Sequence, residues 1–148
     1  MDQVLSAAAA LSLPVAAALL AVEWAVAGVL HPLLDRLPKP ARVAARAESA
    51  ERLGKIMPGW YAAALVCAAA CATIAALDPA THPLVLTVWT VATLGYGIVI
   101  LVTVRRLVPL NDRLAGWRGE PTATWAQTAA RWDRLHHRRT VALGLLLG

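Results

Sequence analysis

Residues 131–148 read RWDRLHHRRTVALGLLLG and decide how many times the chain crosses a membrane. The apolar run from Thr140 to Leu147 is only about 12 Å long as a helix, whereas the hydrocarbon core of a bilayer is about 30 Å thick. A helix that crosses therefore needs about 21 residues and begins near Gln127, which draws histidines and arginines to membrane depth. In the alternative, the helix inserts only in part and its arginines reach back to the cytoplasmic surface. Both descriptions can apply, because the arginines lie on more than one face of the helix.

The composition of the whole chain indicates an integral membrane protein. The 148 residues are 59% hydrophobic, with a mean hydropathy of +0.59, which is too apolar for the surface of a soluble domain. The arginines flank apolar runs and do not form a soluble basic face, which argues against a nucleic-acid partner. We therefore predict an all-α fold, a single-domain four-helix transmembrane bundle over residues 1–148. Its spans are expected at residues 4–30, 58–77, 84–104 and 127–147.

The first polar loop, residues 32–57, carries a helical pattern of its own. Small and apolar residues recur at helical spacing, and charged side chains lie off that stripe. This pattern predicts an amphipathic helix that lies at the membrane interface, within the first cytoplasmic loop. The stripe consists of Val43, Ala47, Ala50, Gly54 and Met57.

The distribution of basic residues predicts the orientation of the bundle. All 14 lysines and arginines lie either in the first loop or from Arg105 onward. Because basic loops stay on the cytoplasmic side, we expect both segments to be cytoplasmic and both termini to lie outside a bacterial-type plasma membrane. Membrane lipids then surround the protein, and four short helices can also assemble as a homo-oligomer.

One carboxylate and one histidine pair are expected at the same depth. Glu23, the ionisable residue inside the first span, lies eight residues before His31 and thus about 12 Å inside the cytoplasmic edge. His136 lies nine residues after Gln127 and thus about 13 Å inside the same edge. Such a group can bind copper, iron or zinc, act as an acid/base pair, or lock two helices together as a structural ion pair. The candidate metal ligands are Glu23, His136 and His137, but adjacent histidines point about 100° apart on a helix, which favours His136.

Other side chains adjoin this candidate site. Trp24 and Trp132 neighbour the two central residues in sequence and can form the walls of a pocket for a flat apolar ligand. Arg139 is expected on the same helical face as Trp132. Asn111 follows a proline, so it can serve a local turn or supply an amide to a substrate or a histidine.

The segments VPLNDRLAGW, residues 108–117, and RWDRLHHRRTVALGLL, residues 131–146, resemble the anthrone oxygenase-like family of small four-helix membrane proteins. Members tend to carry Pro-Leu-Asn after the third span, then a Trp, a His or Asn, and an Arg-Thr pair that leads into the last apolar run. An acidic residue in an Ala-rich first span, here Glu23, is also similar to the family. The matching positions in the two segments are Pro109, Leu110, Asn111, Trp132, His136, Arg139 and Thr140.

The resemblance implies a membrane oxygenase or oxidoreductase that uses O2 on a lipophilic aromatic substrate, as in the conversion of polycyclic anthrones to anthraquinones. Glu23 and His136 would form the core of the site, with Asn111 and Arg139 as supports, and an apolar substrate can enter laterally from the bilayer. The family pattern does not by itself transfer a metal. Two other functions stay open, a small proton-coupled transporter that uses Glu23 and an accessory structural subunit whose polar residues hold helices together.

Overall fold

The computed structural model describes residues 2–147, and all regular elements in that range are helical, as predicted. The chain forms four rods, and two of them contain a short π-helix. The first rod comprises α1 (Asp2–Ala25), η1 (Val26–Leu30) and α2 (His31–Asp35), and the second is α3 (Lys39–Leu77). The third comprises α4 (Pro83–Val102), η2 (Thr103–Leu107) and α5 (Val108–Ala115), and the fourth is α6 (Ala123–Leu147).

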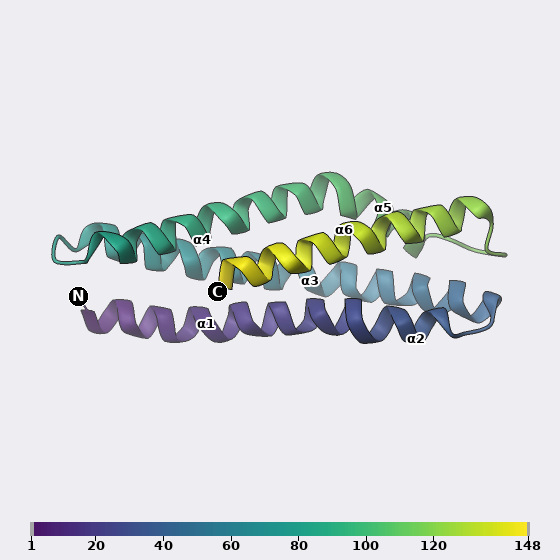
Figure 1. The fold of residues 1–148 in the computed structure, drawn as a ribbon, viewed down its shortest axis with the longest axis horizontal. Coiled ribbons are helices and arrows are strands. Elements are labelled where there is room, and N and C mark those ends of the chain that lie inside the picture. Colours follow the sequence, from purple (N-terminus) through teal and green to yellow (C-terminus); the bar gives the residue numbers. More distant parts are fainter. Residues whose placement is uncertain (1, 148) are drawn as a thin grey trace.

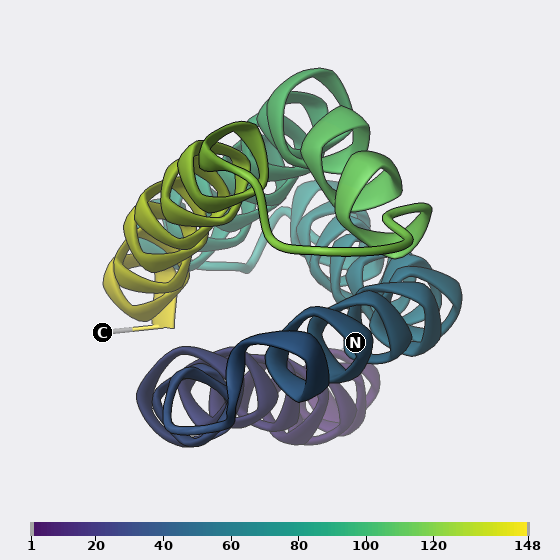
Figure 2. The ribbon, with the colours of Figure 1, turned by 90° about the vertical axis from the view of Figure 1, so that its right-hand side faces the viewer.

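The four rods form an elongated antiparallel bundle (Figure 1). Seen end-on, they surround a common axis, with α3 and α6 on opposite sides (Figure 2). Both α3 and α6 pack against the first and the third rod. Helix α6 ends part-way along the bundle, short of the end at which the N-terminus lies (Figure 1).

Three rods are long and apolar enough to cross a membrane, namely residues Gln3–Asp35, Lys39–Leu77 and Pro83–Ala115. The fourth rod, α6, is not among these candidate spans in the described chain. Its charged residues lie in its first two thirds, which lowers its hydropathy below that of a spanning helix. The membrane character of the protein rests on the three apolar rods, and a fourth crossing stays a prediction.

The structure differs from the prediction of a separate interfacial helix. Residues 39–57 continue without a break into the predicted second span, and Pro58 lies inside the 39-residue helix α3. The first three residues of the apolar stripe that suggested a membrane surface are buried inside the protein instead, where Val43 and Ala50 belong to one hydrophobic cluster with α5 and α6. At about 58 Å, this helix is about twice as long as a bilayer core is thick, so one part of it extends beyond the apolar layer.

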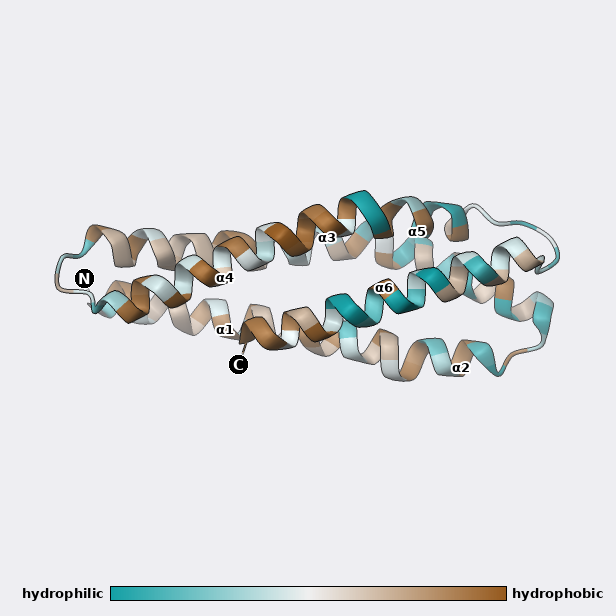
Figure 3. Cartoon of the chain, turned by 45° about the horizontal axis from the view of Figure 1, so that its top comes forward, coloured by the Kyte–Doolittle hydropathy of each residue, from teal (hydrophilic) through white to brown (hydrophobic). Residues whose placement is uncertain are grey.

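The bundle has an apolar end and a charged end (Figure 3). Exposed apolar side chains such as Leu13, Val66 and Leu94 cover the end where α1, α3 and α4 meet. At the other end, α6 exposes Arg131 and Arg138. The border between the two regions falls near the middle of the bundle, and it is at this level that α6 changes from charged to apolar.

Each π-helix is followed by a proline, which explains its position. His31 donates its backbone N–H to Val26, five residues earlier, and Val108 does the same to Thr103. The next residues are Pro32 and Pro109, which lack the N–H for an α-helical bond and whose rings would clash with the carbonyl four residues back. The wider π-turn accommodates this clash without ending the rod.

The two π-helices bend their rods away from α3. Helix α3 packs against α1 and α2 and against α4 and α5, but within the described chain it does not pack against η1 or η2, which lie between them. Helix α6, in contrast, contacts both π-helices. Figure 1 shows the third rod arched at this point. The bulges thus leave room beside α3 at the border between the apolar and the charged end.

Candidate active site

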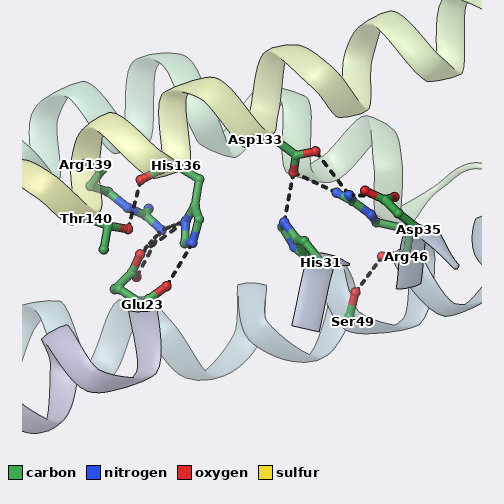
Figure 4. Close-up of polar contacts among 9 residues, drawn as sticks. All are labelled: Glu23, His31, Asp35, Arg46, Ser49, Asp133, His136, Arg139 and Thr140. Carbon is green, nitrogen blue, oxygen red and sulfur yellow. Dashed lines mark hydrogen bonds and ion pairs between the residues drawn. The ribbon is translucent and has the colours of Figure 1, made fainter. Parts of the chain in front are cut away.

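The centre of this region is a buried carboxylate that is paired with a guanidinium. Glu23 of α1 is 1% exposed, and Nη2 of Arg139 lies 3.0 Å and 2.8 Å from its two oxygens (Figure 4). The hydroxyl of Tyr61 donates to Oε1 of the same carboxylate over 2.8 Å. Three helices therefore converge on one side chain, and a charge that would be costly alone is compensated by its neighbours.

His136 contacts both the backbone carbonyl group and the side-chain carboxylate of Glu23. Its Nε2 is 3.2 Å from the Glu23 carbonyl oxygen, and its Nδ1 is 3.2 Å from the carboxylate oxygen Oε2 and 2.9 Å from Arg139 Nη2. Because a carbonyl oxygen only accepts hydrogen bonds, the network assigns the hydrogen of the neutral ring to Nε2. The Nδ1 lone pair then accepts from Arg139, so this nitrogen is the one that can take up a proton.

An aromatic stack connects this group to a second ion cluster. Trp132 stacks on His136 with ring centroids 4.6 Å apart, and His31 packs on Trp132 at 4.9 Å. His31 Nδ1 lies 2.8 Å from an oxygen of Asp133, which also pairs with Arg46 at 2.8 Å. Figure 4 shows the two clusters one after the other along α6. The second cluster fixes the stack, and the stack fixes the plane of the His136 ring.

An apolar cavity of about 170 Å³ lies beside the Glu23 group. For comparison, an apolar cavity of about 150 Å³ in another protein holds one benzene molecule. The side chains of Trp132 and Arg139 line the cavity, and within the described residues their Nε1 and Nε atoms are buried without an acceptor. Since a buried donor without an acceptor costs about 1–3 kcal/mol, a ligand that offers an oxygen would stabilise this arrangement.

Of the residues proposed from the sequence, Glu23, His136 and Arg139 meet directly, and Trp132 stacks on His136. Asn111 also lines the cavity, but its amide donates to the Ala50 carbonyl oxygen over 3.0 Å and not to the Glu23 group.

The structure does not bring Trp24 or His137 to the site. Trp24 is 51% exposed on the outside of α1, and His137 is exposed on α6. Each follows a buried residue of the site, so its side chain is turned by about 100° from that residue. Trp24 is therefore not a wall of the cavity, and His137 is not a partner of Glu23.

A sequence profile of the anthrone oxygenase family matches residues 47–147, more than half of the chain. The chain belongs to the anthrone oxygenase family. The matched range contains His136 and Arg139 as well as Asn111 and Trp132, whereas Glu23 lies before it. No curated protein and no solved structure matched the chain.

The site of this anthrone oxygenase family member does not fit the transition metal considered from the sequence. Glu23 and His136 offer two donors, but the guanidinium of Arg139 already occupies the space that both share. With His137 turned outward, residues 2–147 contain no group of three His, Cys, Asp or Glu side chains that could hold a metal ion. A cation beside a guanidinium is also electrostatically unfavourable, so we derive no role for copper, iron or zinc.

Several residues of the site were not identified as such from the sequence. Tyr61 falls only three residues into the second expected span, residues 58–77, and no sequence pattern marks it as a site residue. With that boundary, Tyr61 would lie only about 5 Å inside the membrane, too shallow to reach Glu23. Helix α3 in fact begins at Lys39, so the start of the apolar run at Pro58 is not the start of the helix. The position of Tyr61 along the bundle therefore could not be read from the start of that run. The pairing of Arg46 with Asp133 joins residues 87 positions apart, and no local pattern indicates it.

Proposed function

We propose that the protein is a membrane oxygenase that converts a methylene group of a lipophilic aromatic ketone, of the anthrone type, to a carbonyl group. The reaction is CH2 + O2 → C=O + H2O. One oxygen atom joins the carbon, and the other leaves as water with both hydrogens. The substrate supplies all the electrons, so no external reductant is required. The family membership and the apolar cavity beside a buried acid/base group support this proposal.

The observation that carries the proposal is the geometry of His136 and Glu23. Nδ1 of His136 takes a proton from the substrate methylene when Arg139 Nη2, from which it accepts over 2.9 Å, turns aside toward the substrate, and the imidazolium so formed lies 3.2 Å from Glu23 Oε2. The carboxylate then stabilises the imidazolium, which is the usual role of the acidic partner of a histidine base. Before this step the negative charge of Glu23 and the positive charge of Arg139 cancel. Afterwards the imidazolium and the substrate anion form a second balanced pair, so no net charge develops in the apolar interior.

Arg139 and Trp132 are suited to stabilise the substrate anion. Removal of the proton places negative charge on the ketone oxygen, and donors already oriented in a water-poor site stabilise such charge strongly. The substrate carbanion then bonds to O2 to form a peroxide anion, and His136 returns its proton to the terminal oxygen of that anion, which gives the hydroperoxide. Removal of the second C–H proton breaks the O–O bond, forms the carbonyl group and releases hydroxide, which takes that proton to leave as water.

The test is anthrone turnover by the purified protein in nanodiscs, followed by oxygen uptake and by the absorbance of the quinone. We expect His136→Gln to lower kcat by about 10²- to 10⁴-fold, the usual contribution of a general base. The matched control is His137→Gln, the adjacent exposed histidine, which should retain normal activity. A folded His136→Gln variant with unchanged kcat would refute the proposal.

The alternatives give different results in the same experiment. If the variants of Glu23 and His136 fail to fold and the native protein does not oxidise anthrone, the group has a structural role. If the native protein is inactive but carries protons across proteoliposomes in a manner that depends on Glu23, it is a transporter.

A further inference from the structure

The cavity has an opening on the outer surface of the bundle between α3 and the third rod. Of the residues that line the cavity, five are exposed, namely Gly54 and Pro58 on α3, Val104 on η2, and Val108 and Asp112 on α5. Val104 is 56% exposed and Val108 is 40% exposed. These five residues form a window, and it lies where α3 and η2 do not pack against each other.

The window lies at the border between the apolar and the charged end of the bundle. On α3, Ile56 lies between the window residues Gly54 and Pro58, and Trp60 lies just beyond them toward the apolar end. Both side chains are exposed. Arg105 and Arg106 are exposed beside Val104. Tryptophan side chains prefer the boundary between lipid tails and headgroups, and long arginine side chains can reach the headgroups from there. The residues around the window therefore match the surface of a bilayer.

A second, larger space lies on the other side of His136, but its chemistry is different. It measures about 500 Å³ and is lined by polar and charged residues that include His31, Asp133 and Arg134. A lipophilic molecule would have to cross water and this charged surface to reach His136 from there. The window is edged by two valines, a proline and a glycine, with Asp112 as its one charged residue, and it leads directly into the apolar cavity.

We propose that the substrate passes from the bilayer into the cavity through the window between α3 and η2. This inference rests on the proposed function for the identity of the substrate. A cavity of about 170 Å³ is close to the size that holds a single benzene ring. It cannot enclose three fused rings, so the reacting ring of an anthrone lies next to His136 while the far ring occupies the window and faces lipid.

The experiment uses the full chain in nanodiscs, with anthrone as the probe. Val104→Trp and Val108→Trp place an indole in the window, and because both positions are exposed the substitutions do not disturb the core. Val102→Trp is the matched control, since Val102 is 46% exposed on the same rod but does not line the cavity. Binding is followed without oxygen from the quenching of tryptophan fluorescence, and oxidation is measured separately by oxygen uptake.

We expect the window variants to lower the rate of anthrone binding and kcat/KM by about tenfold or more, while Val102→Trp changes neither. With the native protein, raising the amount of lipid at fixed total anthrone should lower the rate in proportion to the mole fraction of anthrone in the bilayer. This second measurement does not depend on the folding of any variant.

Two results would refute the proposal that the substrate enters through the window. One is normal binding and turnover in both window variants, and the other is a rate that follows the aqueous concentration of anthrone and ignores the lipid. Anthrone that binds without oxygen, more slowly in the window variants, but is not oxidised when oxygen is added would refute the proposed oxygenase function and leave the window standing.

Discussion

The pairing of Glu23 with Arg139 makes a quantitative prediction about stability. Arg139 provides two of the three side-chain hydrogen bonds to the Glu23 carboxylate, and Tyr61 provides the third. Replacing Arg139 by Met leaves a carboxylate that is 1% exposed with one neutral donor. Removing one partner of a buried ion pair costs about 3–5 kcal/mol, so we expect Arg139→Met to lower the free energy of unfolding by that amount.

The double variant separates this electrostatic cost from simple loss of contacts. Glu23→Gln alone leaves the guanidinium unpaired and should also destabilise the protein. In Glu23→Gln with Arg139→Met, neither charge remains, so the loss of stability should be smaller than the sum of the two single losses. Contacting residues show coupling free energies of about 0.5–3 kcal/mol, and a buried ion pair belongs at the upper end of that range. The double variant should nevertheless remain inactive, because the partner of His136 and the donor to the substrate are both gone.

The assay is reversible unfolding in mixed detergent micelles with increasing SDS, followed by circular dichroism, with oxygen uptake measured in parallel. The control is Lys55→Met, which breaks the exposed pair between Lys55 and Glu51 at the surface of α3 and should have no measurable effect on stability. The reasoning is refuted if the losses in the two single variants add up in the double variant, since the two charges would then not compensate each other.

Three further predictions concern the cavity. A Cβ at Gly54 would lie 2.9 Å from Asn111 Nδ2, so Gly54→Ala should displace that amide and lower kcat/KM for anthrone. The control is Gly59→Ala, whose Cβ meets nothing within 4 Å and which should leave kcat/KM unchanged. Equal kinetics in the two variants would show that the position of Asn111 is unimportant. Trp132→Phe should keep the stack on His136 but lose the buried N–H, and thus raise KM for a ketone while a hydrocarbon analogue binds as before in fluorescence titrations. Dialysis against EDTA should leave oxygen uptake unchanged, and activity that is lost and then returns with added iron, copper or zinc would contradict the donor geometry of the site.

The agreement between sequence and structure is best for features that depend on distance along a single helix. The depth comparison placed Glu23 level with His136 because each residue of a helix advances by a fixed rise, and the two side chains do meet. The π-helix of the first rod, Val26–Leu30, lies within the eight residues counted from Glu23 to His31, but this single wide turn does not keep the two side chains apart. Counting residues from the start of an apolar run was less successful for α3, because its apolar run begins at Pro58, inside the helix and not at its start.

The direction of side chains around each helix was less predictable. His136 was preferred over His137 because it shares a face with Trp132, and that face is the buried one. Trp24 was placed at the site because it adjoins Glu23, although neighbouring residues on a helix diverge by about 100°. Its exposure shows that adjacency in sequence is a poor guide to adjacency in a bundle.

The sequence by itself determined that the protein is helical, apolar and membrane-bound, and that Glu23 and His136 share a level, because hydropathy and helical rise are local properties of the chain. Only the tertiary structure decided that Arg139 pairs with Glu23 itself, that Tyr61 completes the group, that Arg46 pairs with Asp133, and that an apolar cavity opens beside them. These features depend on how far each rod bends at its π-helix and on which rods pack together. Such bends shift whole helices relative to one another, and their effect appears only where segments far apart in the chain meet.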